Sequence, residues 1–211
     1  MKRLATEAIS LTGRPAGAHS GTLMNSSEDL IERVRGGDDE AFRLIFERYA
    51  RFIFRFIYGM VGQRDLAEEL TQETFMGAYK NIGSLRDAAK LSPWLYGIAR
   101  NVTRKSFRSE RGGFDTGLDV ISNIEPTNNE QLSPDRQLLG KERHQAILSA
   151  LGRLDEDKRL AFTLKILQQK SYQEIAEITG QSIAKLKTDV HRAKVEMRGR
   201  LHPLLEVNDE V

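Results

Sequence analysis

Apolar side chains recur at every third or fourth position between residues 41 and 61, and this helical period is the strongest constraint that the sequence places on the fold. Asp38 precedes the stretch, where its short polar side chain can cap a helix, and Asp39 and Glu40 favour the positive helix terminus. We expect the stripe to pack in a core rather than to hold a metal or cofactor. Its members are Phe42, Ile45, Phe46, Tyr49, Phe52, Ile53, Phe56, Ile57 and Met60.

Weaker helical patterns flank this stretch on both sides. A short helix is expected near residues 26–36, ended by two glycines. Residues 64–80 predict an acidic helix, and residues 93–108 predict a basic one, with Ser92 in position to cap it and Pro93 at its first position. The apolar residues that the acidic helix is expected to turn inward are Leu66, Leu70, Phe75 and Tyr79.

Helical periodicity disappears between residues 109 and 134, where glycine, proline and asparagine are frequent. We interpret this stretch as a linker, followed by helices near residues 135–151 and 155–168. The sequence therefore predicts an all-α fold of two small helical domains joined by a flexible linker. The expected units are a disordered tail at 1–25, a first domain at 26–108, the linker at 109–134, a second domain at 135–203 and a tail at 204–211. Met24 is a candidate first residue of the native protein.

The stretch SYQEIAEITGQSIAKLKTDVHRAK, residues 171–194, carries the signals of two helices joined by a tight turn. Ser171 and Glu174 form a capping box that starts the first helix, Gly180 ends it, and Ser182 can cap the second. An apolar stripe along both helices completes a helix-turn-helix pattern. The positions of the second helix that packing does not need are Ser182, Lys185, Lys187, Thr188, Asp189, Arg192 and Lys194.

A helix-turn-helix presents its second helix to the major groove of DNA. Lysine and arginine there neutralise phosphates, while short polar side chains reach base edges. The alternative is a solvated helix whose charges serve only solubility, but the capped turn in front of it favours the DNA-binding interpretation.

The net charge of +2 hides a segregation of charge along the chain. The basic helix interleaves cations with Trp94, Tyr96 and Phe107, a composition that suits single-stranded nucleic acid, although Trp94 could equally belong to the core. The acidic helix cannot favour the same ligand. Its carboxylates either face solvent or meet a basic protein partner, and we favour the protein interface.

Several function classes have no support in the sequence. The chain has no cysteine, its four histidines are scattered, and it lacks a glycine-rich phosphate loop and a nucleophile elbow. We therefore predict no enzymatic activity, catalytic residue, metal or cofactor. The lack of cysteine fits a reducing cytoplasm, and no run of about 18 apolar residues suggests a membrane span.

Three stretches together resemble the extracytoplasmic-function (ECF) sigma factors, the two-domain group of bacterial sigma-70-type initiation factors. They are DLAEELTQETFMGAYK at 65–80, SPWLYGIARNVTRKSFR at 92–108 and LGRLDEDKRLAFTLKILQQKSYQEIAEITGQSIAKLKTDVHRAK at 151–194. The resemblance extends over most of the chain from about residue 28 to 201. The last stretch alone would also fit many response regulators.

The resemblance implies a sigma factor that directs core RNA polymerase to promoters and promotes DNA opening. The acidic helix would dock on the clamp helices of the largest polymerase subunit, through Glu68, Glu69, Leu70, Gln72, Glu73 and Phe75. The loop at 83–90 and the basic helix would hold the melted -10 strand, with a flipped base in the loop, through Ser84, Arg86, Asp87, Lys90, Trp94, Arg100, Asn101, Arg104, Lys105 and Arg108. The helix-turn-helix would read the -35 element through Ser171, Tyr172, Ser182, Lys185, Lys187, Thr188, Asp189, His191, Arg192 and Lys194.

The partners that the resemblance implies are core RNA polymerase, including the flap of its second-largest subunit, promoter DNA and an anti-sigma factor. The free protein would be a cytoplasmic monomer. Lys185 and Asp189 stand where the family often has threonine and arginine, and Glu69 where it commonly has aspartate. Because an aspartate can accept from a cytosine amino group, we expect a different base preference at that position.

Two other functions stay open at this point. One is a free-standing helix-turn-helix transcriptional regulator that binds its operator as a dimer without polymerase. The other is an interaction protein whose basic faces bind no nucleic acid. Co-purification with core polymerase is expected only for the sigma factor.

Overall fold

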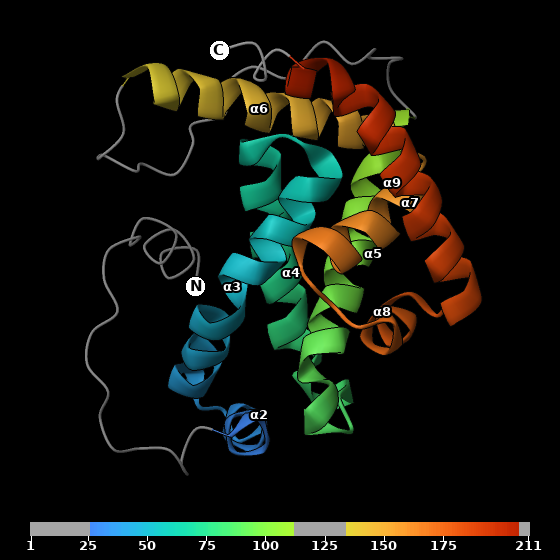
Figure 1. The fold of residues 1–211 in the computed structure, drawn as a ribbon. Helices are drawn as coiled ribbons and strands as arrows, with labels where there is room; N and C mark the ends of the chain where they lie inside the picture. Colours follow the sequence, from blue (N-terminus) through green and yellow to red (C-terminus); the bar gives the residue numbers. More distant parts are fainter. Residues whose placement is uncertain (1–25, 112–133, 207–211) are drawn as a thin grey trace.

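The computed structural model describes residues 26–111 and 134–206, and all regular elements within these ranges are helices (Figure 1). The predicted all-α class is confirmed. The predicted N-terminal tail, most of the predicted linker and the last five residues lie outside the described ranges. The N-terminal helices are α2 (Ser27–Arg35), α3 (Asp39–Val61), α4 (Arg64–Asn81), η1 (Ile82–Ser84), η2 (Ala88–Lys90) and α5 (Leu91–Arg111). The C-terminal helices are α6 (Pro134–Gly152), α7 (Glu156–Phe162), η3 (Thr163–Leu167), α8 (Tyr172–Thr179) and α9 (Ile183–Glu206).

The N-terminal domain is built around α3. Asp38 caps this helix as expected, since its Oδ1 accepts hydrogen bonds from the backbone N–H groups of Glu40 and Ala41 at 3.0 and 3.2 Å. Gly62, in the left-handed conformation at φ 75°, ends it. Six residues of the predicted apolar stripe are buried: Ile45, Phe46, Ile53, Phe56, Ile57 and Met60. Phe42 and Tyr49 are half-buried against this core, and the prediction was wrong at Phe52, which is 49% exposed.

Helices α4 and α5 pack against α3 through aromatic contacts. The ring centroids of Phe46 and Phe75 lie 4.8 Å apart, and those of Phe42 and Tyr79 lie 5.0 Å apart, both edge to face. The Tyr79 hydroxyl donates to Asp39 Oδ1 at 2.6 Å, which ties the end of α4 to the start of α3. These contacts fix the angle at which α4 presents its acidic face.

The basic helix begins earlier than predicted, and Ser92 does not cap it. Asp87 caps the short helix η2 instead, accepting from the Ala89 N–H at 2.9 Å, and the chain runs from η2 directly into α5 at Leu91. Ser92 thus lies inside the first turn of α5, where its hydroxyl accepts from Lys170 Nζ at 3.2 Å. The prediction of a cap at Ser92 was wrong, because the capping residue, Asp87, lies before η2.

The C-terminal domain contains the predicted helix-turn-helix, formed by α8 and α9. The capping box is present in both directions: Ser171 Oγ accepts from the Glu174 N–H at 3.1 Å, and Glu174 Oε2 accepts from the Ser171 N–H at 2.8 Å. Gly180 makes the turn at φ 71°. The helix predicted at 155–168 is divided into α7 and the π-helical η3, after which Gln169 adopts a positive φ of 55°.

The two domains pack directly against each other. Leu160, Leu164 and Ile175 of the C-terminal domain belong to the same buried cluster as the interior of the N-terminal domain. At Gly59 the backbone of α3 approaches η3 so closely that an added Cβ would lie 2.9 Å from Thr163 Cγ2. Figure 1 shows α7 and α8 beside α5, with α6 across one end of the N-terminal helices. The two domains that the sequence predicts on either side of the linker are therefore in direct contact in this structure.

Within the described part of the chain, none of the helices is both long and apolar enough to cross a membrane.

Candidate DNA and polymerase interfaces

One face of α9 is exposed along three turns and carries most of the residues predicted to meet the -35 element. Six of the predicted residues on this face are exposed basic or polar side chains of α9. The exposed residues from the predicted set are Ser171, Ser182, Lys185, Lys187, Thr188, His191, Arg192 and Lys194, while Tyr172 is half-buried. The Lys187 ammonium stands 5.9 Å from the Tyr172 ring centroid, so the ring supports the start of this face.

Asp189 does not lie on that exposed face. It is 8% exposed, and its Oδ2 accepts from Lys185 Nζ at 2.7 Å. The same ammonium donates to Asp157 Oδ2 on α7 at 2.8 Å. The sequence-based placement of Asp189 as an outward side chain was therefore wrong, because α7 packs against α9 on the side that the helical pattern left open.

Some of the residues predicted to bind the -10 strand are exposed, and others contact the C-terminal domain. Ser84, Arg86, Asp87, Lys90, Asn101, Lys105 and Arg108 are exposed, and Trp94 is half-buried. Arg100 and Arg104, in contrast, reach the C-terminal domain: Arg100 donates to the Ile178 carbonyl oxygen at 2.9 Å, and Arg104 Nε donates to Glu156 Oε1 at 2.5 Å. Burial lowers the pKa of Arg100 from its ordinary value.

Further contacts between the domains surround this pair. Tyr96 donates its hydroxyl to Gln168 Oε1 at 3.1 Å, and Arg159 donates to the Met60 carbonyl oxygen at 2.7 Å. Sequence reasoning missed Gln168, Glu156 and Arg159 because nothing in their spacing shows which surface another domain will cover. The basic face of α5 is thus partly occupied by the chain itself.

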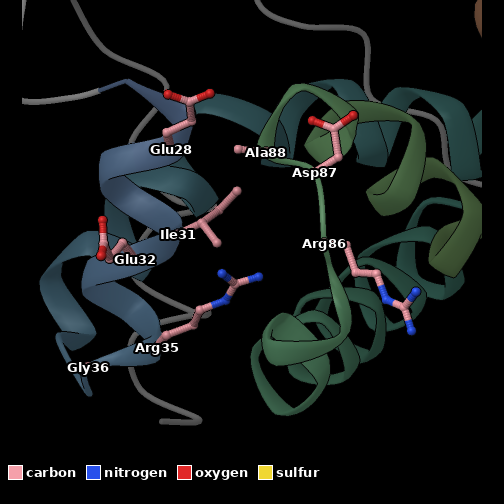
Figure 2. A pocket seen from close by; sticks show the side chains of 8 residues that line it. All are labelled: Glu28, Ile31, Glu32, Arg35, Gly36, Arg86, Asp87 and Ala88. Carbon is pink, nitrogen blue, oxygen red and sulfur yellow. The ribbon is translucent and has the colours of Figure 1, made fainter.

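The loop that joins α4 to α5 is held by α2. Arg35 donates to the Leu85 carbonyl oxygen, and Leu85 is 5% exposed. An open pocket of about 700 Å³ lies between α2 and the loop, lined by Glu28, Ile31, Glu32, Arg35, Gly36, Arg86, Asp87 and Ala88. Figure 2 shows Arg35 reaching from α2 toward the loop and Arg86 directed away from α2. The loop therefore presents a fixed backbone with exposed polar tips.

The acidic face of α4 carries Glu69 and Glu73 as exposed side chains, with Glu68 and Gln72 half-buried beside them. Two other members of the predicted polymerase-binding set point inward, since Leu70 is 4% exposed and Phe75 is 3% exposed. Leu70 and Phe75 therefore belong to the core of the N-terminal domain, beneath the acidic face of α4. Sequence reasoning missed Met76, which is 50% exposed. Its position seven residues after Glu69 was the available signal, because this spacing returns to the same helix face.

Among the described residues, no group of three or more histidine, aspartate or glutamate side chains is arranged to hold a metal ion.

Comparison with known proteins matches both domains in chain order. The Sigma-70 region 2 family model matches residues 45–112, and the Sigma-70, region 4 model matches residues 144–197. The chain is 31% identical over 183 residues to the ECF RNA polymerase sigma-E factor of Escherichia coli strain K12. This alignment covers 83% of this chain and 94% of that protein. It is 32% identical over 176 residues to the ECF RNA polymerase sigma factor BldN of Streptomyces coelicolor, covering 83% of this chain and 65% of that protein.

Solved structures give the same result for the fold. CnrH in complex with the cytosolic domain of CnrY superimposes with a TM-score of 0.63 at 18% identity, over 87% of this chain and 99% of that one. The sigma factor RpoE in complex with the anti-sigma factor NepR from Bartonella quintana gives 0.62 at 25% identity, over 76% and 96%. With regions 2 and 4 both matched and 94% of the Escherichia coli sigma-E factor covered at 31% identity, this chain belongs to the ECF group of sigma-70-family RNA polymerase sigma factors.

Proposed function

We propose that this sigma factor joins core RNA polymerase, places it on a promoter and captures the opened non-template strand, without catalysis of its own. The observation that carries the proposal is the presence, on the two matched domains, of three separate faces with exposed charged residues: an acidic face on α4 and basic faces on α5 and α9. Each face suits a different partner. A single free-standing regulator would not need the acidic one.

The α9 face suits the major groove of the -35 element. Lys187, Arg192 and Lys194 are exposed cations that can neutralise phosphates. The exposed Thr188 lies among them; its hydroxyl donates to the Ala184 carbonyl oxygen at 3.1 Å, so its oxygen remains as an acceptor for a base edge. The capped α8 fixes the approach of α9, because a helix-turn-helix enters the groove with its second helix. Ser171 and Tyr172, at the start of α8, would face the DNA backbone.

The loop at 83–90 and α5 suit the melted -10 strand. Exposed Asn101, Lys105 and Arg108 follow one side of α5, and the exposed tips of the loop stand at its beginning. Unstacking a base costs a few kcal/mol, which contacts in the loop and with the aromatic side chains would have to offset. The half-buried Trp94 offers part of one ring surface for this purpose.

For polymerase, we propose that Glu69, Gln72 and Glu73 meet basic residues of the clamp helices, with Met76 adding an apolar contact. Leu70 and Phe75 would act from the core by holding α4 in place. The linker would follow polymerase channels, and the C-terminal domain would rest near the flap of the second-largest subunit.

We further infer that the free protein is closed and that the C-terminal domain leaves α5 before the -10 strand binds. Arg100 and Arg104 are only partly available to phosphates while Arg100 donates to the Ile178 carbonyl oxygen and Arg104 Nε donates to Glu156. The Arg104–Glu156 pair is partly exposed on both sides and contributes at most about 1 kcal/mol. The shared apolar cluster therefore provides most of the stability of the closed state.

The buried Nε of Arg100 indicates that this closed contact is imperfect. It has no hydrogen-bond partner among the described residues. Such an unpaired donor costs about 1–3 kcal/mol, which opening to solvent or to a phosphate would recover. The exposed α9 face, unlike α5, is available to duplex DNA in the closed state.

An anti-sigma factor is the regulatory partner that we propose. The similar RpoE structure contains one, and both its TM-score and its identity support comparison with this chain. The protein would act as a cytoplasmic monomer that alternates between this partner and polymerase.

Run-off transcription with purified core polymerase tests the proposed function. We expect transcripts from a subset of genomic fragments only when the protein is added, and co-purification of the protein with core polymerase. If core polymerase neither retains the protein nor gains promoter-specific transcripts, the sigma-factor function is wrong. Tight DNA binding in that case would favour a free-standing regulator instead.

Replacing Lys187 with alanine should weaken duplex binding to all sequences alike, because its exposed ammonium neutralises a phosphate rather than reading a base. The slope of log affinity against log salt should become shallower by about 1. Fluorescence anisotropy with a specific and an unrelated duplex at several salt concentrations measures both effects. Val195→Ala, on the same helix and also exposed, is the control. A loss confined to the specific duplex would instead make Lys187 a base reader.

A further inference from the structure

Lys185 is held between two carboxylates at the beginning of the recognition helix. Its Nζ lies 2.8 Å from Asp157 Oδ2 on α7 and 2.7 Å from Asp189 Oδ2 one turn further along α9. The Lys185 side chain remains 44% exposed, whereas the Asp189 side chain is 12% exposed. Two of the three ammonium donors are therefore engaged by carboxylates, one on the half-exposed Asp157 and one on the nearly buried Asp189, which leaves the third for a partner.

This arrangement removes most of the freedom of a side chain that is ordinarily flexible. A surface lysine samples many rotamers and contacts phosphate as a point charge. Here Asp189 anchors the ammonium from within the same helix, and Asp157 anchors it from a neighbouring one. The three groups carry a combined charge of -1, so this site does not attract phosphate as an isolated lysine would.

The hydrogen bond from Lys185 holds the pKa of Asp157 below its ordinary value, and the bond to Asp157 raises that of Lys185. Both groups accordingly stay ionised at neutral pH.

We propose that Asp157, acting with Asp189, is a positioning residue that aims Lys185 at one base pair of the -35 element, so that base preference depends on a residue outside the helix-turn-helix. This inference rests on the proposed function, because it assumes that α9 enters the major groove. The remaining donor of Lys185 suits an acceptor on a base edge, such as guanine O6 or N7 or thymine O4. Without Asp157, the ammonium would turn to the nearest phosphate, a contact that carries no sequence information.

The test uses the full chain assembled with core RNA polymerase and a duplex library with a randomised upstream segment. Wild-type holoenzyme should select one base pair opposite the start of α9. Asp157→Asn should reduce that preference about tenfold, in line with the discrimination typical of one good base contact, and should raise affinity for unrelated duplex because a negative charge is lost. Asp157→Glu should restore part of the preference.

Asp155→Asn is the matched control. Asp155 also stands at the start of α7, but its carboxylate pairs with Lys158 at 2.8 Å rather than with the recognition helix. If Asp157 only stabilised α7, both asparagine variants would lower the melting temperature and leave the selected sequence unchanged. Unchanged selection with Asp157→Asn would overturn the proposal.

A double-mutant cycle gives the second criterion. Lys185→Ala should abolish preference at the same base pair, and adding Asp157→Asn to it should have no further effect on selection. A full additional effect would show that Asp157 acts by another route and would also overturn the proposal. If wild-type holoenzyme selected no sequence at all, the result would contradict the proposed function itself, together with this inference.

Discussion

Gly59→Leu should open the closed arrangement of the two domains while leaving each domain folded. A Cβ added at Gly59 would lie 2.9 Å from Thr163 Cγ2, and the three nearest atoms all belong to Thr163 and Leu167 of η3. Thr163 is fully buried and β-branched, so its side chain has little room to move. Overpacking of this kind costs about 1–3 kcal/mol, which shifts the opening equilibrium about 5- to 150-fold.

Small-angle X-ray scattering of the free protein would measure the opening as a larger radius of gyration. Binding of a fluorescent single strand with a -10-like sequence should tighten in parallel, because Arg100 and Arg104 are released. Gly199→Leu is the matched control, since nothing lies within 4 Å of a Cβ added there. An unchanged radius of gyration for Gly59→Leu, with the protein still folded, would contradict a separable domain contact.

The closed contact also bears on how polymerase and the -10 strand cooperate. If only a fraction of the free protein is open, its apparent affinity for the strand is reduced by that fraction. A partner that binds the open form better removes this reduction, and the gain is limited to its differential affinity for the two forms. On the proposed function, core polymerase would need no contact with Arg100 or Arg104 to make them available to the strand. It only needs to hold the C-terminal domain elsewhere.

Local signals allowed the sequence to predict most of the long helices that the structure contains. The Ser171–Glu174 capping box, the Asp38 cap and Gly180 each act within a few residues, so their geometry follows from short-range hydrogen bonds and backbone preference. The long α3 was equally clear because its period extends over many turns. Predicting these features did not require knowing which helices pack against each other.

Errors occurred where a side chain's environment depends on another element. Asp189 looked outward by helical position alone, but α7 covers it and Lys185 satisfies its carboxylate. An arginine at this position would be forced into a buried site, so Asp189→Arg would test stability more than base preference. Likewise, the placement of Arg100 and Arg104 against another domain is a tertiary outcome with no local signal.

Reversing both charges on the α4 face, with Glu69→Lys and Glu73→Lys, should reduce affinity for core polymerase by roughly 100-fold or more. Like charges brought together at an interface cost several kcal/mol, and both side chains are exposed enough to meet a partner directly. The fold should survive, because the ion pair that these two residues make within residues 26–111 and 134–206, Glu73 with Lys105 at 3.6 Å, joins side chains that are 48% and 80% exposed. A pair this exposed contributes little stability.

Core binding without DNA, followed by fluorescence anisotropy of labelled protein, is the appropriate measurement because it leaves the α5 and α9 faces out of the readout. Glu142→Lys with Glu177→Lys is the matched control: both residues are exposed, both lie in the C-terminal domain, and the change in net charge is the same. Equal losses for the two double variants would indicate a response to overall charge, whereas a loss confined to α4 would identify its acidic face as the docking surface. Circular dichroism must show unchanged helicity in both, since α4 also supports the loop at 83–90 through its C-terminal end.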